Sequence, residues 1–216
     1  MKHLLFLFIS FAVFQSSFCQ GSVTMLDKDF KVSRVPDSSV LGPLERNPAF
    51  ESLSQLEQDI VYWMNMVRKD PAKFYSNWIL PFISQFPEAK GSDFKSLSAE
   101  MKTPLALFEP RAGLNKTAKG HAQDIVAGRI GFTHAGPGGK SFEQRMKDAG
   151  IVNCAGENML EGKDDALVAV ILLLIDKNVR GHGHRKLILH PSLNTIGVAF
   201  IPWTRNHILV QDFSCK

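Results

Sequence analysis

Cysteine is scarce in this 216-residue chain, and the common catalytic signatures are missing. With three cysteines the chain is not a small scaffold built on disulfides. It has no CxxC, no HExxH, no G-x-S-x-G and no glycine-rich dinucleotide fingerprint. Its basic residues are scattered and not interleaved with aromatic residues, so we expect no nucleic-acid partner. What is present is an ordinary globular composition, with 44% hydrophobic and 21% charged residues.

The first 20 residues have the pattern of a secretory signal peptide. A basic start precedes an apolar run over residues 4–14, and small and polar residues follow. This run is too short to span a bilayer. We therefore predict a leader over 1–20 and a secreted protein that is extracellular, periplasmic or associated with the cell surface, without a transmembrane segment. Cys19 raises lipidation as an alternative, which Phe18 disfavours because lipidated cysteines follow a small residue.

The rest of the chain reads as one domain behind a linker. Residues 21–50 lack sustained periodicity and contain Pro, Gly and Ser, which predicts an extended N-terminal arm or linker. We predict one domain over 51–216. Its first helix starts at a capping box made by Ser54 and Glu57.

The order of the predicted elements indicates the fold class. A helix is expected from Pro110 on, after a short strand over 105–108, and a buried helix at the ten apolar residues 166–175. The chain ends in two apolar strands that flank the turn PWTRN. Helices early and midway, with strands between and at the end, predict an α+β domain layered as an α-β-α sandwich with a C-terminal β-hairpin. Cys154 and Cys215 could form one disulfide, but their spacing does not decide this.

Two of the four stretches that carry candidate chemistry come before residue 150. In GFTHAGPGG, His134 precedes a glycine-rich turn that leaves room beside the imidazole, although an ordinary loop histidine is the alternative. In SFEQRMKDAG, Glu143 lies in the first turn of a helix, where the helix dipole favours an acid. A surface ion pair with Lys147 is the alternative for Glu143. We interpret His121, on the apolar face of the preceding helix, as a structural histidine.

The other two stretches are CAGENML and VRGHGHRKLILHP. Glu157 interrupts an apolar strand, and the missing side chain of Gly156 would admit a ligand or another backbone. His182 and His184 could form a metal pair on an extended segment. We interpret His190, which precedes a proline, as a turn residue.

Taken in order, these pieces resemble the CAP superfamily, which includes cysteine-rich secretory proteins, insect venom antigens and plant pathogenesis-related proteins. The resemblance extends from Ser52 to Phe213. Its most specific parts are GEN, then GHRKLIL, then TIGVAF. The low cysteine content is similar to the bacterial branch of that family.

The resemblance implies an α-β-α sandwich whose central cleft brings together His134, Glu143, Glu157 and His184. It also implies that His134 and His184 bind a divalent cation, often zinc, with the two acids nearby through water. Such a site would be open and weak, because catalytic zinc usually has three protein ligands. His182 is an additional imidazole that could compete for the cation or join it.

The resemblance favours a secreted binding protein whose cleft takes a lipid, a sterol, a glycan or a protein partner. The alternative is a metal-dependent hydrolase, most plausibly a peptidase, with Glu143 or Glu157 as catalytic general base on a cation-bound water. A third interpretation is that the four residues are purely structural.

Overall fold

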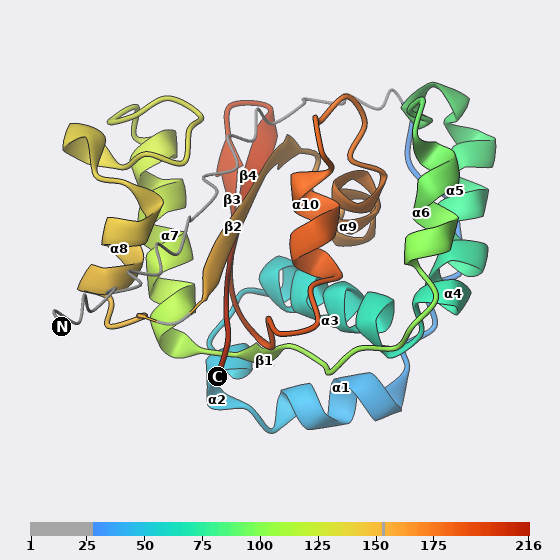
Figure 1. The fold of residues 1–216 in the computed structure, drawn as a ribbon, viewed down its shortest axis with the longest axis horizontal. Helices are drawn as coiled ribbons and strands as arrows, with labels where there is room; N and C mark the ends of the chain where they lie inside the picture. Colours follow the sequence, from blue (N-terminus) through green and yellow to red (C-terminus); the bar gives the residue numbers. More distant parts are fainter. Residues whose placement is uncertain (1–27, 153) are drawn as a thin grey trace, which may run out of the picture.

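The computed structural model describes residues 28–152 and 154–216, in which helices cover both faces of one four-stranded sheet (Figure 1). The predicted leader over 1–20 and residues 21–27 lie outside the described residues. The strand order is β1-β3-β4-β2, with bounds β1 (Glu109–Pro110), β2 (Ala155–Gly162), β3 (Thr195–Trp203) and β4 (Asn206–Ser214). β1 is parallel to β3, whereas β4 is antiparallel to both β3 and β2. β2 is therefore an edge strand of this sheet.

Two helical layers sandwich the sheet (Figure 1). One layer contains α7 (Ala112–Val126) and α8 (Phe142–Asp148), and the other contains α3 (Gln55–Lys69), α9 (Ala166–Ile175) and α10 (Gly183–Ile188). Ala118, Ala122 and Ile125 of α7 form a small core with Met159 and Val210 of the sheet. The larger core lies on the opposite face, under α3 and α9. These layers and the β3–β4 hairpin confirm the predicted α+β sandwich.

The close approach of α7 to the sheet depends on Gly197 of β3. A Cβ atom at this position would lie 2.0 Å from the backbone carbon of Leu114 and 2.3 Å from the backbone nitrogen of Asn115. Any side chain here would push the helix away from the strand. The Asn115 side chain also accepts a hydrogen bond from the Val198 backbone at 3.2 Å, which holds α7 in register on β3.

Side-chain caps begin α3, α8 and α9, and the capping box predicted at Ser54 and Glu57 is confirmed. Ser54 and Glu57 form a reciprocal capping box at the start of α3. Asp165 caps α9 by accepting a hydrogen bond from the Val168 backbone at 3.1 Å. The ten apolar residues of α9 are nearly all buried, as expected for a helix that is apolar on every side. At α8 only half of a capping box forms, because Ser141 accepts a hydrogen bond from the Gln144 backbone, whereas the Gln144 side chain contacts Asp148.

Two expectations for the N-terminal half are corrected. The described part of the predicted arm contains α1 (Ser38–Glu45) and α2 (Pro48–Glu51), and it buries Phe30 and Val40. Helices of one or two turns are too short to show sustained periodicity, so their signal is only the caps. The strand expected over 105–108 is also absent there, and β1 follows it directly at Glu109.

A series of short helices connects α3 to β1. They are α4 (Pro71–Phe74), the π-helical η1 (Tyr75–Ile79), α5 (Leu80–Gln85), the 3-10 helix η2 (Pro87–Ala89) and α6 (Phe94–Glu100). Edge-on aromatic contacts pack them against other segments, with Trp78 against Trp63 of α3 at 5.3 Å and Phe82 against Phe30 at 5.2 Å between ring centres. This segment is therefore packed through its aromatic residues.

Arg68 of α3 is fully buried, and it has no carboxylate partner among the residues that the structure describes. Its guanidinium donates to four backbone carbonyls, those of Ala106, Ile188, His190 and Leu193, at 2.5 to 3.0 Å. The ring of Phe108 lies 4.0 Å from the guanidinium carbon. Burial lowers the pKa of Arg68 to about 10, so the side chain is still charged at neutral pH. One side chain thus ties α3 to the segment before β1 and to the loop between α10 and β3.

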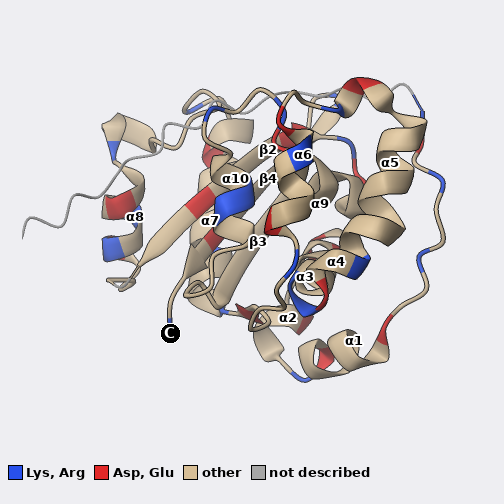
Figure 2. Cartoon of the chain, turned by 45° about the vertical axis from the view of Figure 1, so that its right-hand side comes forward, with Lys and Arg blue, Asp and Glu red and all other residues tan. Residues whose placement is uncertain are grey.

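Arg185 has a comparable role at the end of α9. It is also fully buried, and it donates to the backbone carbonyls of Leu174 and Ile175 at 2.8 and 3.0 Å. The negative end of a helix dipole favours such a cation. Glu100 of α6 neutralises it at 2.9 Å. Elsewhere, acidic and basic residues are distributed over both helical layers (Figure 2).

Cys154 and Cys215, whose pairing the sequence left open, form a disulfide with 5.6 Å between their Cα atoms. It ties the start of β2 to the residue after β4. Within residues 28–152 and 154–216, no helix combines the length and the apolar character that a bilayer crossing needs.

We expect Arg68→Met to lower the free energy of unfolding by roughly 3 kcal/mol or more, because it leaves buried carbonyls without a donor. Arg68→Lys is expected to lower the free energy of unfolding similarly, since one ammonium group cannot replace a planar fork of donors. Urea unfolding followed by circular dichroism measures both changes. Arg205→Met, at an exposed position in the β3–β4 turn, is the matched control. An Arg68→Met variant as stable as this control would contradict the assigned role.

Candidate functional site

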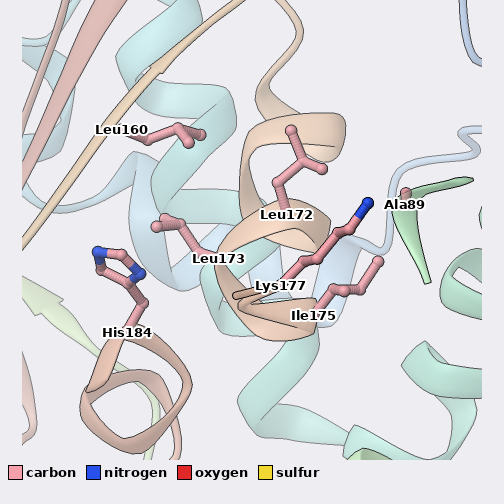
Figure 3. A pocket seen from close by; sticks show the side chains of 7 residues that line it. All are labelled: Ala89, Leu160, Leu172, Leu173, Ile175, Lys177 and His184. Atoms are coloured by element: carbon pink, nitrogen blue, oxygen red, sulfur yellow. The ribbon is translucent and has the colours of Figure 1, made fainter. Parts of the chain in front are cut away.

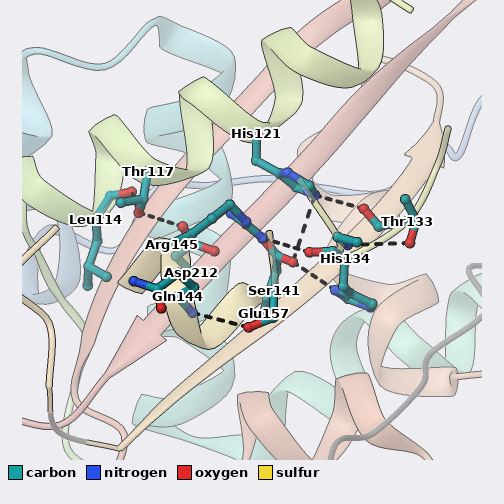
Figure 4. A network of polar contacts seen from close by, with 11 residues as sticks. Leu114, Thr117, His121, Thr133, His134, Ser141, Gln144, Arg145, Glu157 and Asp212 are labelled. Carbon is teal, nitrogen blue, oxygen red and sulfur yellow. Dashed lines mark hydrogen bonds and ion pairs between the residues drawn. The ribbon is translucent and has the colours of Figure 1, made fainter. Parts of the chain in front are cut away.

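The candidate site lies around Glu157, on the side of the sheet covered by α7 and α8 (Figure 4). Side chains alternate between the two faces of a strand. Glu157 and Met159 of β2 therefore face α7, whereas Asn158 faces α10 and donates to the His184 backbone carbonyl. Glu157 is paired in register with Asp212 of β4, which brings two carboxyl groups together on the same face.

Both carboxylate oxygens of Glu157 are engaged. Nδ1 of His134 lies 2.8 Å from Oε1, and Arg145 of α8 donates to Oε2 at 2.6 Å. The Glu157 side chain is only 2% exposed. Burial alone would raise the pKa of Glu157, but the hydrogen bond from His134 and the charge of Arg145 together lower it. Glu157 is therefore a buried, charged anchor for the loop after α7 and for α8.

The pKa of the neighbouring Asp212 carboxyl group is shifted in the opposite direction. Complete burial and the negative charge of Glu157 raise the pKa of Asp212 well above its ordinary value. Thr117 of α7 donates to Asp212 Oδ2 at 2.6 Å. Two carboxyl groups this close favour a single negative charge. Glu157 carries that charge, since it holds Arg145, and the raised pKa of Asp212 favours its protonated form.

His121 completes this polar network from α7. Its Nε2 donates to the backbone carbonyl of Thr133 at 2.8 Å and lies 3.9 Å from Glu157 Oε1. Burial lowers the pKa of His121, which favours a neutral ring with its proton on Nε2. Its Nδ1 then acts as an acceptor, and it has no hydrogen-bond partner among the described residues. The expected structural role of His121 agrees with this contact to the backbone.

An open cleft of about 630 Å³ lies beside the network, between α7 and α8. His121 and Arg145 form part of its lining. Its other lining residues are charged, small or polar: Gly113, Lys116, Thr117, Gly120, Asp124, Pro137, Lys140, Asp148 and Ala149. This volume falls in the range of pockets for small molecules, which is about 300–1,000 Å³.

His184 is placed on the other side of β2. It lies in α10, where its Nδ1 contacts Asp176 Oδ1 at 2.7 Å and its backbone amide donates to the same carboxylate at 3.0 Å. Gly156, where the sequence suggested room for a ligand, faces the Leu187 side chain of α10 instead. The pocket that His184 lines with Leu173 and other residues (Figure 3) measures only about 10 Å³, room for about one water.

The four residues expected in one cleft do not converge. His134 and Glu157 are in contact, His184 is bound to Asp176 across β2, and Glu143 is exposed on α8. Among the residues that the structure describes, no three histidine, cysteine or acidic side chains are grouped so that they could hold a metal ion. The physical reason is strand alternation, since β2 separates the partners of His134 from those of His184.

His134 and His184 belong to separate polar groups, so this arrangement does not present them as a pair to one cation. His134 contacts Glu157, which Arg145 neutralises, whereas His184 contacts Asp176. His182 does not add a third ligand to either group, because it lies 3.5 Å from Asp93. The other histidine of that stretch, His190, accepts a hydrogen bond from the Ser192 backbone, as expected for a turn residue.

The sequence did not single out Arg145, Asp212, Asp176 or Thr117. Arg145 stands two residues after Glu143, and a charged residue on a short helix gave no signal to prefer one over the other. Asp212 could have been noticed as an acid within the last apolar strand, HILVQDF, by the same argument that singled out Glu157 in β2.

We expect Asp212→Asn to remove a pH dependence of stability. The pKa of Asp212 is raised in the folded state. Its contribution to the free energy of unfolding is therefore fully present below the ordinary pKa of 3.8, and it is lost as the pH rises through the folded-state pKa. The variant should therefore gain stability relative to the original protein on going from about pH 5 to about pH 8. Urea unfolding at both pH values measures this, with the exposed Asp164→Asn as control. A difference between variant and original protein that falls with pH would contradict a neutral Asp212.

For zinc, we expect no stoichiometric site that depends on both His134 and His184. Calorimetric titration of the purified protein should give the same weak response for the original protein, His134→Ala and His184→Ala. The exposed His190→Ala controls for binding to single surface imidazoles. One zinc ion per chain, lost in both of the first two variants but not in the control, would overturn this arrangement.

Comparison with known proteins identifies a family. Residues 101–213 match the family model described as the cysteine-rich secretory protein family, CAP. None of the curated protein sequences compared with the chain matches it.

Three solved structures are similar to the chain. An extracellular SCP-domain protein of Bacillus anthracis str. Ames is 19% identical, with a TM-score of 0.47 over 74% of this chain and 40% of that one. An outer surface protein of Borrelia burgdorferi is 20% identical, with a TM-score of 0.44 over 62% of this chain and 92% of that one. Venom allergen-like protein 4 of Schistosoma mansoni is 14% identical, with a TM-score of 0.46 over 76% of this chain and 90% of that one.

All three TM-scores are below 0.5, and this chain spans less than half of the Bacillus protein. The assignment therefore depends on the family model, which matches more than half of the 216 residues. The chain belongs to the cysteine-rich secretory protein (CAP) family.

Proposed function

We propose that this CAP-family chain is an extracellular binding protein that takes a small polar ligand, such as a glycan, in the cleft between α7 and α8. The observation that carries the proposal is the cleft itself, about 630 Å³ and lined by His121 and Arg145. Both side chains are largely buried and retain polar atoms without a protein partner among the described residues. Buried polar atoms are normally satisfied, so unsatisfied ones beside an open cleft favour a ligand or water.

The extracellular location is supported by two features of the chain. One is the signal-peptide pattern over residues 1–20. The other is the Cys154–Cys215 disulfide, since disulfides persist in oxidising compartments such as the cell exterior and the periplasm.

The lining of the cleft favours a glycan over a lipid or a sterol. Lys116, Asp124, Lys140 and Asp148 lie on it, and a fatty chain or a sterol ring would have to strip water from these charges without replacing it. The pocket beside His184 is too small for such a ligand, at about 10 Å³.

A binding role also agrees better with the state of the two acids than hydrolysis does. A general base needs an oxygen that can reach a substrate or a water. Both oxygens of Glu157 are occupied by His134 and Arg145, and Glu143 is exposed without contact to the network. The network around Glu157 then has a supporting role, in which it holds α8 and the preceding loop as one wall of the cleft.

Gly120→Leu tests the proposal without threatening the fold. Gly120 lines the cleft in the middle of α7, and a Cβ atom there would meet nothing within 4 Å. Leucine should fill the cleft and also stabilise the helix, because glycine costs about 1 kcal/mol in a helix interior. We expect loss of glycan binding, by roughly tenfold or more, with an unchanged or higher melting temperature.

Binding is measured by NMR titration of ¹⁵N-labelled protein with a panel of mono- and disaccharides. The expected shifts are confined to amides of residues 113–124 and 137–149. Saccharide binding that Gly120→Leu leaves intact, or that shifts only resonances around α9 and α10, would contradict the proposed cleft. Binding of a fatty acid or a sterol but of no saccharide would contradict the proposed ligand.

A further inference from the structure

We infer that the cleft between α7 and α8 recognises an anionic oxygen group, a carboxylate or a phosphate, on a hydroxylated ligand such as a sugar acid or a sugar phosphate. This inference rests on the proposed function and specifies its ligand. The recognising groups are Arg145 and Lys116, with His121 as acceptor for a hydroxyl group.

Arg145 has more donors than the protein uses. One terminal nitrogen donates to Glu157 Oε2 at 2.6 Å and to the His134 backbone carbonyl at 3.2 Å. The other terminal nitrogen and Nε have no acceptor among the described residues, and the side chain is only 10% exposed. Buried guanidinium donors without an acceptor are costly, and hydrogen bonds from a charged guanidinium to carboxylate or phosphate oxygens are strong. The unused donors of Arg145, on Nε and on the second terminal nitrogen, are therefore suited to the oxygen atoms of an anionic group.

The acids on the cleft are already paired. Asp124 contacts Arg129 at 2.6 Å, and Asp148 contacts Lys140 at 2.7 Å. Lys116 lies on the same lining, is exposed, and makes no ion pair within the part of the chain that the structure describes. The charge that the cleft still offers to a ligand is therefore positive, which favours an anion over a cation.

Gly120 leaves an open space on the side of the cleft that α7 lines. Its Cβ position is empty, whereas a Cβ at Gly197 would collide with the α7 backbone. Packing therefore requires glycine at 197 and does not require it at 120. Gly120 is followed in the sequence by His121, which also lines the cleft. The Nδ1 atom of His121 has no partner among the described residues and can accept a hydrogen bond from a ligand hydroxyl. An anionic group for Arg145 and a hydroxyl for His121 together define a sugar acid or a sugar phosphate.

Calorimetric titration of the purified protein with glucuronate, glucose 6-phosphate and glucose tests this inference. We expect saturable binding of at least one of the two anionic sugars, with glucose at least roughly tenfold weaker. The preferred anion identifies whether a carboxylate or a phosphate is the natural group.

Two matched variants on α7 separate the site from general surface charge. Lys116→Glu should weaken binding of the anionic sugar by roughly tenfold. Lys119→Glu makes the same charge change on the same helix, outside the cleft lining, and should bind as the original protein does. Equal loss in both variants would overturn the inference, because it would show an electrostatic effect without a site.

The remaining outcomes distinguish this inference from the proposed function. If glucose binds as well as the anionic sugars, and Gly120→Leu abolishes both, the cleft is a glycan site and the anionic preference is wrong. If none of the three sugars binds, and the wider saccharide panel also fails, the proposed function and this inference are both overturned.

Discussion

The fold depends on a buried positive charge that is satisfied by backbone rather than by an acid. Arg68 donates to carbonyls from two segments that lie 38 and about 120 residues further along the chain. The second of those segments leads into β3, and the first leads through Phe108 into β1, where Asn65 exchanges two hydrogen bonds with the Phe108 backbone. β1 and β3 are parallel neighbours, and α7 follows β1, so the position of the candidate site follows from this anchor.

The same principle is repeated at the site with the opposite charge. Glu157 is a buried anion whose desolvation is offset by Arg145 and by the hydrogen bond from His134. These contacts join β2, α8 and the loop before α8, which together form one side of the cleft. Burial and the charge of Glu157 raise the pKa of Asp212, the second carboxyl group, which favours its neutral form. Two donor nitrogens of Arg145 have no partner among the described residues. The residue that stabilises this side of the cleft can therefore also contact a ligand.

The helix starts and the C-terminal hairpin could be predicted because they depend on residues that are close together in the sequence. Ser54 with Glu57 and Asp165 before an apolar run determine helix starts within four residues. The β3–β4 hairpin follows from two apolar segments around a short turn. The contact of His134 with Glu157 is different, because it joins residues 23 apart, and it was expected only through the family resemblance. That resemblance did not reveal Asp176, which binds His184 instead.

The sequence by itself determined the secretory leader pattern, the α+β class, the capped helices, the terminal hairpin and the motifs by which the family is known. Only the tertiary structure decided on which side of β2 His134 and His184 lie and that Cys154 pairs with Cys215. It also decided that Arg145 and Asp212 belong to the polar network around Glu157. The reason is that capping and periodicity act over a few residues of backbone. Partnership between side chains depends instead on how distant segments pack and on which side of a strand each one falls.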